Sequence, residues 1–389
     1  MMNSFFEKYS FVCRWVAAIF LLGWLLSIHG GFSKRDYFGQ PLGPDFLPFY
    51  TAASLLNQNR GAELYDFHAQ IDLQSTILNS PQNYLHPYLN LPLFAEALRP
   101  LALLDYRLAF MLWTLLGLAI LTFSAQKLGK HFEWSWLGWF PLFAAIAYGQ
   151  NSFFSLGIVA VCSWLWVERN SPFRAGLVLG LLFYKPQLMV GLVLGFLILR
   201  EWRVLFGVGM MGGIGALLSW IFLREETLNY FRFSSEQLPL LMAVPGAPHT
   251  QFFDSRGFLK LLLPALSGKF LMLGWGIVLL IAIILFWKWS QFSKSKNRSQ
   301  RMAGIALLIP WGAPYLLLYD WTLLLVPFWL LSVGDFRNEK NREEIVGCLW
   351  IVALLSYPFS QWMFNHWGFA IQLAPLVLGV FTYRFFRKE

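Results

Sequence analysis

The chain alternates between long, continuous runs of hydrophobic residues and shorter polar stretches. A helix needs about 20 apolar residues to cross the ~30 Å hydrocarbon layer of a membrane, and only helices and closed barrels satisfy their backbone hydrogen bonds there. Because the runs do not alternate with period two, they indicate helices. They predict an all-α polytopic membrane protein with about twelve segments (range about 10–13), at 11–28, 106–125, 134–148, 153–167, 175–184, 188–199, 204–222, 269–287, 303–318, 321–333, 345–357 and 368–383.

The stretch 175–199 is interrupted by Lys185-Pro186-Gln187, so it is either one kinked span or a hairpin of two short helices. With a hairpin, about 19 of the 30 Lys and Arg residues, including the dense run at 288–301, fall on the same side as both termini, as the positive-inside rule requires. A single span would place that run outside. The charge pattern therefore favours the hairpin and a multi-pass protein of the cytoplasmic (inner) membrane with both termini cytoplasmic.

Two long stretches, 29–105 and 223–268, lie outside the membrane under this topology. Within the first, 46–56 and 91–104 are amphipathic and predict interfacial helices. The N-terminus resembles a signal peptide, but no A-x-A cleavage site follows its apolar run, so we expect an uncleaved first span. The whole chain, 1–389, is predicted to form a single integral membrane domain with two extracytoplasmic loops.

Composition narrows the class of protein further. Hydrophobic residues make up 57% and charged residues 13% of the chain, compared with about 45–50% and about 25% in soluble proteins. A soluble globule is nearly excluded. The net charge of +9 is explained by cytoplasmic loops, so no nucleic-acid partner is expected. The three cysteines lie far apart, and Walker A, HExxH, GxSxG and DxD patterns are absent, so we expect no metal and no cofactor.

The first candidate for chemistry is Gly-Pro-Asp-Phe-Leu-Pro-Phe-Tyr at 43–50, shortly after the first span. Asp45 is a carboxylate at the outer membrane face, between prolines and aromatic residues, and suits a general base for a substrate at the lipid boundary. Tyr50 lies in the same motif. The alternative is that Asp45 caps an interfacial helix that begins near Pro48.

Further polar groups occur in outer turns. His86, in Tyr-Leu-His-Pro-Tyr, could bind a phosphate or hydroxyl, or it could be structural. Gln150 and Asn151 lie in a very short turn, where amides need partners that substrate hydroxyls or the turn's own backbone would supply. Lys185, followed by Gln187, could bind a phosphate oxygen, or its ammonium could snorkel to the headgroups.

The last candidate is Tyr319-Asp320, in the turn between the ninth and tenth segments. Asp320 is the only acidic residue in the hydrophobic hairpin 303–333. It could ligate a substrate hydroxyl, or it could form an ion pair with Lys185, Arg232 or Arg256.

Several short motifs follow one another along the chain. They are Asp45-Phe46, Phe49-Tyr50, Ala52-Ala53, Leu64-Tyr65-Asp66, His86-Pro87, Pro100-Leu101-Ala102, Gly149-Gln150-Asn151, Ala175-Gly176 through Gly180 to Lys185-Pro186-Gln187, and Pro314 to Tyr319-Asp320. Their order and spacing over most of the chain resemble glycosyltransferase family 87, integral membrane mannosyltransferases of the GT-C superfamily that use a polyprenyl-phosphate sugar. The resemblance implies a GT-C fold with an extracytoplasmic active site.

The resemblance also implies a catalytic acidic residue in the first outer loop, which corresponds to Asp45, and a metal-independent displacement that inverts the anomeric centre. The chain departs from the family pattern at two places. It has Tyr319-Asp320 where some members have a histidine pair, and His86-Pro87 where others have Tyr-Pro-Pro. These positions bear on the choice of acceptor and sugar.

We therefore expect an inverting glycosyltransferase that moves a hexose, mannose in the first place, from a polyprenyl-phosphate sugar to a glycan or lipid acceptor. Asp45 would be the base, and Lys185 and Arg256 would stabilise the donor phosphate. The residues expected to position substrates are Tyr50, His86, Gln150, Asn151, Gln187, Tyr319 and Asp320. The alternative is a transporter or flippase of polyprenyl-linked glycans, but transporters keep polar residues at the midplane, whereas here they gather at one outer boundary.

Overall fold

The computed structural model describes residues 9–29, 34–82, 84–128, 134–238, 249–292, 297–332 and 340–387. Throughout these ranges the regular structure is helical. The β-type pairing found there is limited to two isolated bridges, one between Arg35 and Pro41 and one between Phe252 and Leu317. The all-α prediction is confirmed for this part of the chain.

Long apolar helices indicate a membrane protein. Among the described residues, five helices are long and apolar enough to cross a membrane: α2 (Ser10–His29), α6 (Tyr106–Lys127), α11 (Trp202–Phe222), α15 (Gly268–Phe292) and α19 (Lys340–Trp367). Large apolar side chains on their surfaces, such as Leu22, Leu115 and Leu217, are more than half exposed. Such a surface is favourable where lipid is the solvent. The number of about twelve segments stays a prediction.

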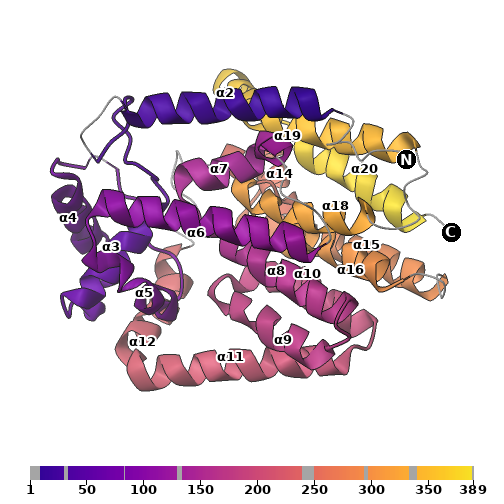
Figure 1. Cartoon of the computed structure of the whole chain (residues 1–389), viewed down its shortest axis with the longest axis horizontal. Helices are drawn as coiled ribbons and strands as arrows, with labels where there is room; N and C mark the ends of the chain where they lie inside the picture. Colours follow the sequence, from indigo (N-terminus) through magenta and orange to yellow (C-terminus); the bar gives the residue numbers. More distant parts are fainter. Residues whose placement is uncertain are drawn as a thin grey trace.

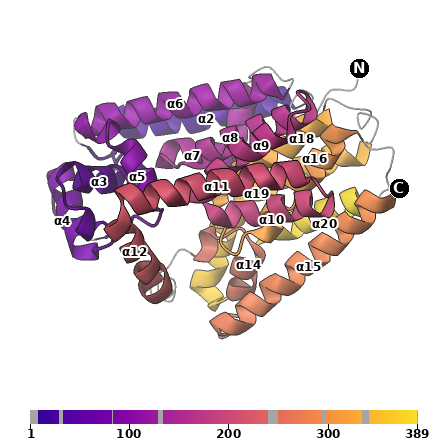
Figure 2. The same ribbon diagram turned by 90° about the horizontal axis from the view of Figure 1, so that it is seen from below.

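Shorter helices fill the interior. They are α7 (Phe140–Tyr148), α8 (Ser152–Val167), α9 (Pro172–Gly180), α10 (Pro186–Ile198), α16 (Arg298–Ala306), α17 (Ile309–Gly312), α18 (Leu325–Ser332) and α20 (Leu373–Arg387), with 3-10 turns η3 (Trp134–Gly138), η4 (Leu181–Tyr184) and η7 (Leu318–Leu324). In Figure 2, α8 and α10 lie between α2 on one side and α15 on the other. Trp139, Trp166 and Trp321 are fully buried in this core.

The chain reverses at Lys185, as the hairpin interpretation requires. Helix α9 packs closely on α11, because a Cβ on Gly176 would lie 2.0 Å from the Val204 carbonyl and a Cβ on Gly180 would lie 2.6 Å from Met211 Cβ. Contacts that advance in the same direction along both helices make α9 and α11 parallel. The helix that connects them, α10, must therefore run in the opposite direction.

Several predicted helices are broken in the structure; the segment 134–148, for example, is a 3-10 turn followed by α7, with Trp139 extended between them. The segment 303–318 is not one helix: α16 ends at Ala306, the short α17 ends at Gly312, and Ala313 is extended (φ −82°, ψ 121°). Pro314 explains the end of α17, because the residue before a proline avoids the helical region. The segment 91–104 is likewise divided at Pro100 into α5 (Pro92–Leu98) and the 3-10 turn η2 (Leu101–Leu103).

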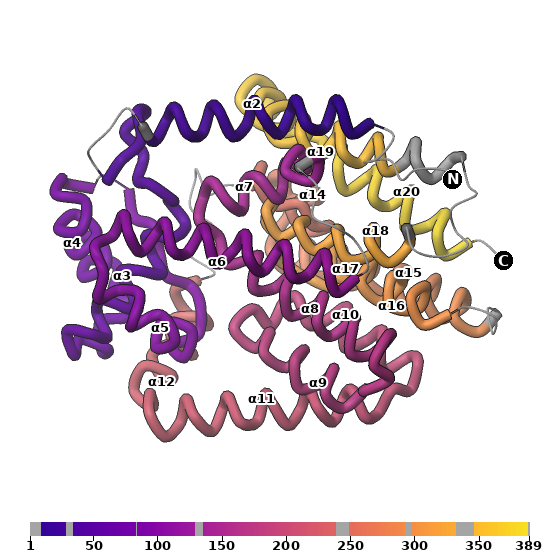
Figure 3. The backbone as a smooth tube through the Cα atoms, viewed as in Figure 1, coloured from indigo at the N-terminus to yellow at the C-terminus, as the bar shows by residue number. Residues whose placement is uncertain are grey.

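The described part of the stretch between α2 and α6 forms a layer at one end of the molecule. Its helices are α3 (Phe46–Asn57), α4 (Phe67–Leu78) and α5, and they are joined there by α12 (Arg224–Arg232) from the second stretch (Figure 1). Tyr65 stacks on Phe233 with ring centroids 5.2 Å apart, which fixes the two stretches together. The start of α2 and the end of α20 lie at the opposite end of the molecule (Figure 3).

Candidate active site

Asp45 lies where two turns of the chain touch. One turn contains Gly43 (φ +61°), and the other contains Gly149 (φ +69°) and connects α7 to α8. The Asp45 N–H donates to the Tyr148 carbonyl at 2.9 Å. A Cβ on Gly149 would lie 2.7 Å from Cβ of Phe46, so glycine is needed for this approach as well as for the left-handed backbone. The contact brings together two motifs that are about 100 residues apart in the sequence.

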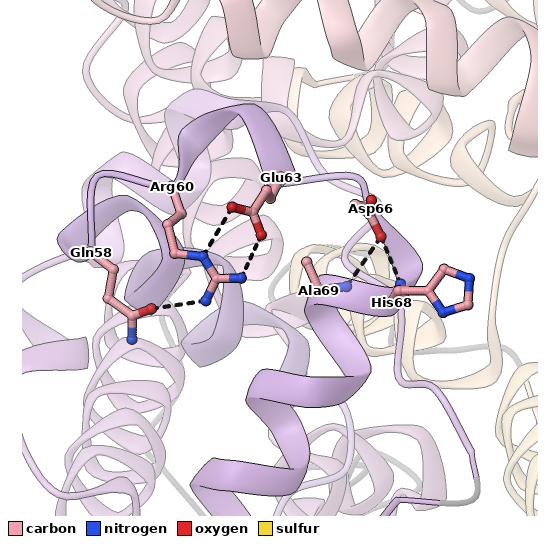
Figure 4. A network of polar contacts seen from close by, with 6 residues as sticks. All are labelled: Gln58, Arg60, Glu63, Asp66, His68 and Ala69. Carbon is pink, nitrogen blue, oxygen red and sulfur yellow. Dashed lines mark hydrogen bonds and ion pairs between the residues drawn. The ribbon is translucent and has the colours of Figure 1, made fainter.

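The Asp45 carboxylate does not cap a helix. Asp45 occupies the N-cap position of α3, which begins at Phe46, but its side chain makes no capping hydrogen bond. Asp66 at the start of α4 is a true cap: its carboxylate accepts the His68 N–H at 2.8 Å, as Figure 4 shows next to the surface ion pair of Arg60 with Glu63. The interpretation of Asp45 as a cap is therefore wrong. Asp45 is half-buried as a residue, and its carboxylate is not used as a helix cap.

The surroundings of Asp45 change its acidity. Burial raises the pKa of Asp45 to about 6, and the nearby charge of Asp320 acts in the same direction. A hydrogen bond with the Gln150 side chain and the charge of Lys185 lower the pKa and offset part of this effect. A carboxylate with a pKa of about 6 is ionised at neutral pH and is a stronger base than an ordinary aspartate.

A buried ion pair lies near Asp45. Lys185 Nζ is 2.8 Å from Asp320 Oδ1, and the same oxygen accepts a hydrogen bond from the Ser152 hydroxyl at 2.7 Å. The two charged residues are only 6% and 4% exposed, and the ammonium lies 5.6 Å from the centroid of the Tyr319 ring. Lys185 therefore does not snorkel, and of the three cations considered for Asp320 it is Lys185 that forms the pair.

The amides of the α7–α8 turn differ in how they are satisfied. The backbone is paired, because the Gln150 N–H donates to the Ala145 carbonyl at 2.9 Å and the Asn151 N–H donates to Gln150 Oε1 at 3.2 Å. The Asn151 side chain is fully buried, yet neither its oxygen nor its nitrogen has a hydrogen-bond partner. A buried amide without partners is costly, so a water or a substrate hydroxyl bound here would gain hydrogen bonds.

Three predicted residues lie outside this hydrogen-bonded cluster. The Tyr50 hydroxyl donates to the Leu104 carbonyl at 2.6 Å. The His86 backbone N–H and carbonyl are held by the Gln74 side chain. Gln187 is half-buried in the first turn of α10. Within the described residues, no hydrogen bond connects any of these three to Asp45.

Arg256 lies in a separate pocket of about 270 Å³, which α14 (Ser255–Leu262) forms with the start of α15. Its guanidinium lies over the Tyr315 ring, 4.2 Å from the centroid, and its Nη1 is buried without a hydrogen-bond partner. Lys260 and His249 also line this pocket. Asp254 is the one carboxylate in its lining among the described residues.

The segment 314–321 connects the pocket to the ion pair. The Phe253 N–H donates to the Leu316 carbonyl at 2.7 Å, and Asp254 Oδ2 accepts the Leu316 N–H at 2.8 Å. The Trp321 indole N–H donates to the Phe253 carbonyl at 3.0 Å. Tyr315 faces the pocket and Asp320 faces Lys185, so the two sites share one well-fixed strip of chain.

Sequence reasoning missed four residues of these two sites. Lys260 carried a usable signal, because residues four apart on a helix share a face and Arg256 was already a candidate. Ser152 and Tyr184 directly adjoin candidates, and the Tyr184 hydroxyl bonds to Ser155 at 2.7 Å and to the Asn151 carbonyl at 3.3 Å. His249 carried no signal, because nothing in the sequence places it beside Arg256.

The fold and the site together define a helical membrane protein in which a carboxylate that caps no helix lies near a buried ion pair. The model of glycosyltransferase family 87 matches residues 88–310, more than half of the chain. The chain belongs to this family, and it is a membrane glycosyltransferase. No curated protein and no solved structure matches it. The matched range includes Gln150, Asn151, Lys185 and Arg256 and begins after Asp45.

Proposed function

We propose that the protein transfers a hexose, mannose in the first place, from a polyprenyl-phosphate sugar to a glycan or lipid acceptor, with inversion at the anomeric carbon. The observation that carries this proposal is the carboxylate of Asp45, which makes no capping bond, lies close to Gln150, Lys185 and Asp320, and has a pKa that burial raises to about 6. The proposed setting is the cytoplasmic membrane, with both termini cytoplasmic, the active site extracytoplasmic and lipids around the apolar helices.

The reaction is a single displacement. Asp45 takes the proton of the acceptor hydroxyl as its oxygen forms a bond to the anomeric carbon. The bond from that carbon to the phosphate oxygen breaks, and the electron pair leaves with the polyprenyl phosphate. A phosphate is a good leaving group, so no general acid is needed. What the protein must supply is a base, orientation of the two substrates and cations near the developing phosphate charge.

The remaining residues take roles that follow from their contacts. Because the charge of Lys185 is matched by Asp320, we assign Lys185 a positioning role and leave the phosphate to Arg256. Gln150 holds Asp45, and the unpaired Asn151 amide can bind a hydroxyl of sugar or acceptor. The ring of Tyr319 lies next to the Lys185 ammonium, so Tyr319 is part of the same cluster.

The decisive experiment is Asp45→Asn, assayed in membranes with a polyprenyl-phosphate sugar labelled in the sugar. We expect release of free polyprenyl phosphate to fall by about 10²–10⁴-fold, because the amide cannot accept the acceptor's proton. Asp66→Asn is the matched control: it alters a capping aspartate of the same outer layer and should leave transfer within a few-fold of the parent. Activity of Asp45→Asn within a few-fold of the parent would refute the base assignment.

A further inference from the structure

The pocket beside α14 has an excess of positive charge. Arg256 and Lys260 lie one helical turn apart, and the Lys260 ammonium donates to the Pro264 carbonyl at 2.7 Å. Neither forms an ion pair with a described residue. The carboxylate of Asp254 accepts the backbone N–H groups of Gly257 and Leu316, both at 2.8 Å, which uses one lone pair of each oxygen.

The guanidinium of Arg256 is held in place with donor capacity unused. The guanidinium lies over the Tyr315 ring, 4.2 Å from its centroid, and its buried Nη1 has no hydrogen-bond partner among the described residues. A guanidinium presents a rigid fork of N–H groups that matches two oxygens of a phosphate. His249 adds an uncharged polar ring at neutral pH, because burial, and then the charges of Lys260 and Arg256, lower its pKa. The lining of the pocket therefore suits an anion with oxygen acceptors.

The cluster around Asp45 is unsuited to the same anion. Its charged residues are Asp45, Lys185 and Asp320, so ionised Asp45 leaves a formal charge of −1. A phosphate bound to Lys185 would face two carboxylates and would have to compete with Asp320 for the ammonium. The pocket, by contrast, holds two cations and one carboxylate, which gives +1 with His249 neutral.

We infer that this pocket binds the phosphate group of the lipid carrier, with Arg256 and Lys260 as its ligands; the inference rests on the proposed function and names the phosphate site within it. The volume of about 270 Å³ suits a headgroup better than a whole lipid. Tyr315 of the pocket and Tyr319 of the Asp45 cluster are four residues apart, so their Cα atoms are separated by at most about 14 Å. The two sites are neighbours.

The test is direct binding of radiolabelled farnesyl phosphate to the full-length protein, purified in detergent. We expect Arg256→Gln and Lys260→Gln each to weaken binding by at least about tenfold, since each removes a charge-assisted hydrogen bond. Arg256→Lys should restore part of the affinity. Arg232→Gln on α12 removes a basic residue of the same outer stretch outside the pocket, and Asp45→Asn removes the base; both should bind like the parent.

Competition identifies the source of the phosphate. Unlabelled farnesyl phosphate should displace the probe, whereas farnesol, inorganic phosphate and phosphatidylglycerol in mixed micelles should not. Displacement by phosphatidylglycerol at similar concentration would overturn the carrier in favour of a membrane-lipid headgroup. Parent-like binding by folded Arg256→Gln and Lys260→Gln, or equal loss in Arg232→Gln, would overturn the pocket itself.

Failure of the inference is distinguishable from failure of the proposed function. If Arg256→Gln binds farnesyl phosphate like the parent while the parent still transfers sugar, the pocket assignment fails and the function stands. If the pocket variants lose binding while the parent transfers no sugar from any polyprenyl-phosphate donor, the function fails and the phosphate site stands. Elution profile and thermal midpoint confirm that each variant is folded.

Discussion

The cluster at Asp45 and the pocket at Arg256 lie on the same strip of chain but have opposite charge. The cluster holds two carboxylates and one ammonium, and its cation is already paired with Asp320 in a buried ion pair. The pocket holds two cations that form no ion pair with any described residue, and one carboxylate bonded to the backbone. A negative site suits removal of a proton, and a positive site suits a departing phosphate. Under the proposed function, proton transfer and phosphate binding therefore fall to different residues.

The largest effect is expected from breaking the ion pair of the cluster. Asp320→Asn would leave the Lys185 ammonium buried without a counter-charge, and we expect about 3–5 kcal/mol of lost stability. The measurement is the denaturation midpoint of the purified protein in detergent. Glu63→Gln, which breaks the exposed pair with Arg60, is the control and should cost at most about 1 kcal/mol.

A double variant sharpens this prediction. Replacing both partners, Lys185→Met with Asp320→Leu, removes the unpaired charge and should recover most of the stability without recovering transfer. Equal midpoints for Asp320→Asn and Glu63→Gln would show that the pair contributes little. The cluster would then be no more rigid than the surface.

A smaller loss is expected from separating the two turns that hold Asp45. In Gly149→Ala the new Cβ would lie 2.7 Å from Phe46 Cβ, and overpacking of this kind costs about 1–3 kcal/mol. Gly39→Ala is the matched control, because Gly39 also has positive φ (+77°) but has no atom within 4 Å of the added Cβ. The difference in midpoint between the two variants therefore reports the contact itself. Transfer should fall only in Gly149→Ala, and equal behaviour of the two would contradict the arrangement.

The pH dependence of transfer separates the two regions. Asp45 must be ionised to act as a base, and burial raises its pKa to about 6. We therefore expect kcat/KM to be constant above about pH 7 and to fall about tenfold per pH unit below about 6. Burial also raises the pKa of Asp254 to about 6, but its protonation removes negative charge from the pocket and would not weaken anion binding. A flat profile between pH 5 and 8 would count against Asp45.

The fold and the candidate residues were predictable to different degrees. Continuous apolar runs predicted the long helices, because a helix of that length and composition is favourable in lipid and unfavourable in water. The breaks near Ala313 and Pro100 lie in runs whose hydropathy does not change, and only the prolines mark them. The hairpin at Lys185 could be predicted from the distribution of charge. One additional reversal of the chain determines on which side of the membrane the basic run at 288–301 falls.

The pairing of site residues was less accessible. Asp45 and Gln150 meet because two glycine turns touch, and Lys185 reaches Asp320 across 135 residues. Neither contact has a local sequence signal. Sequence reasoning therefore placed Lys185 and Arg256 together as phosphate ligands, because residue type was the available evidence. The structure separates them according to whether the cation already has a partner.

The smallest predicted effect concerns the aromatic ring that holds Arg256. Tyr315→Leu removes the face over which the guanidinium lies, and a cation–π contact at a partly exposed site is worth about 0.5–1 kcal/mol. Farnesyl phosphate affinity should fall about two- to fivefold, because Arg256 keeps its charge but loses its fixed orientation. Tyr315→Phe retains the ring and should bind like the parent. If Tyr315→Phe loses as much affinity as Tyr315→Leu, the hydroxyl of Tyr315 contributes more than its ring. Orientation of Arg256 by the ring would then not explain phosphate binding in the basic pocket, and Lys260 would be its main ligand.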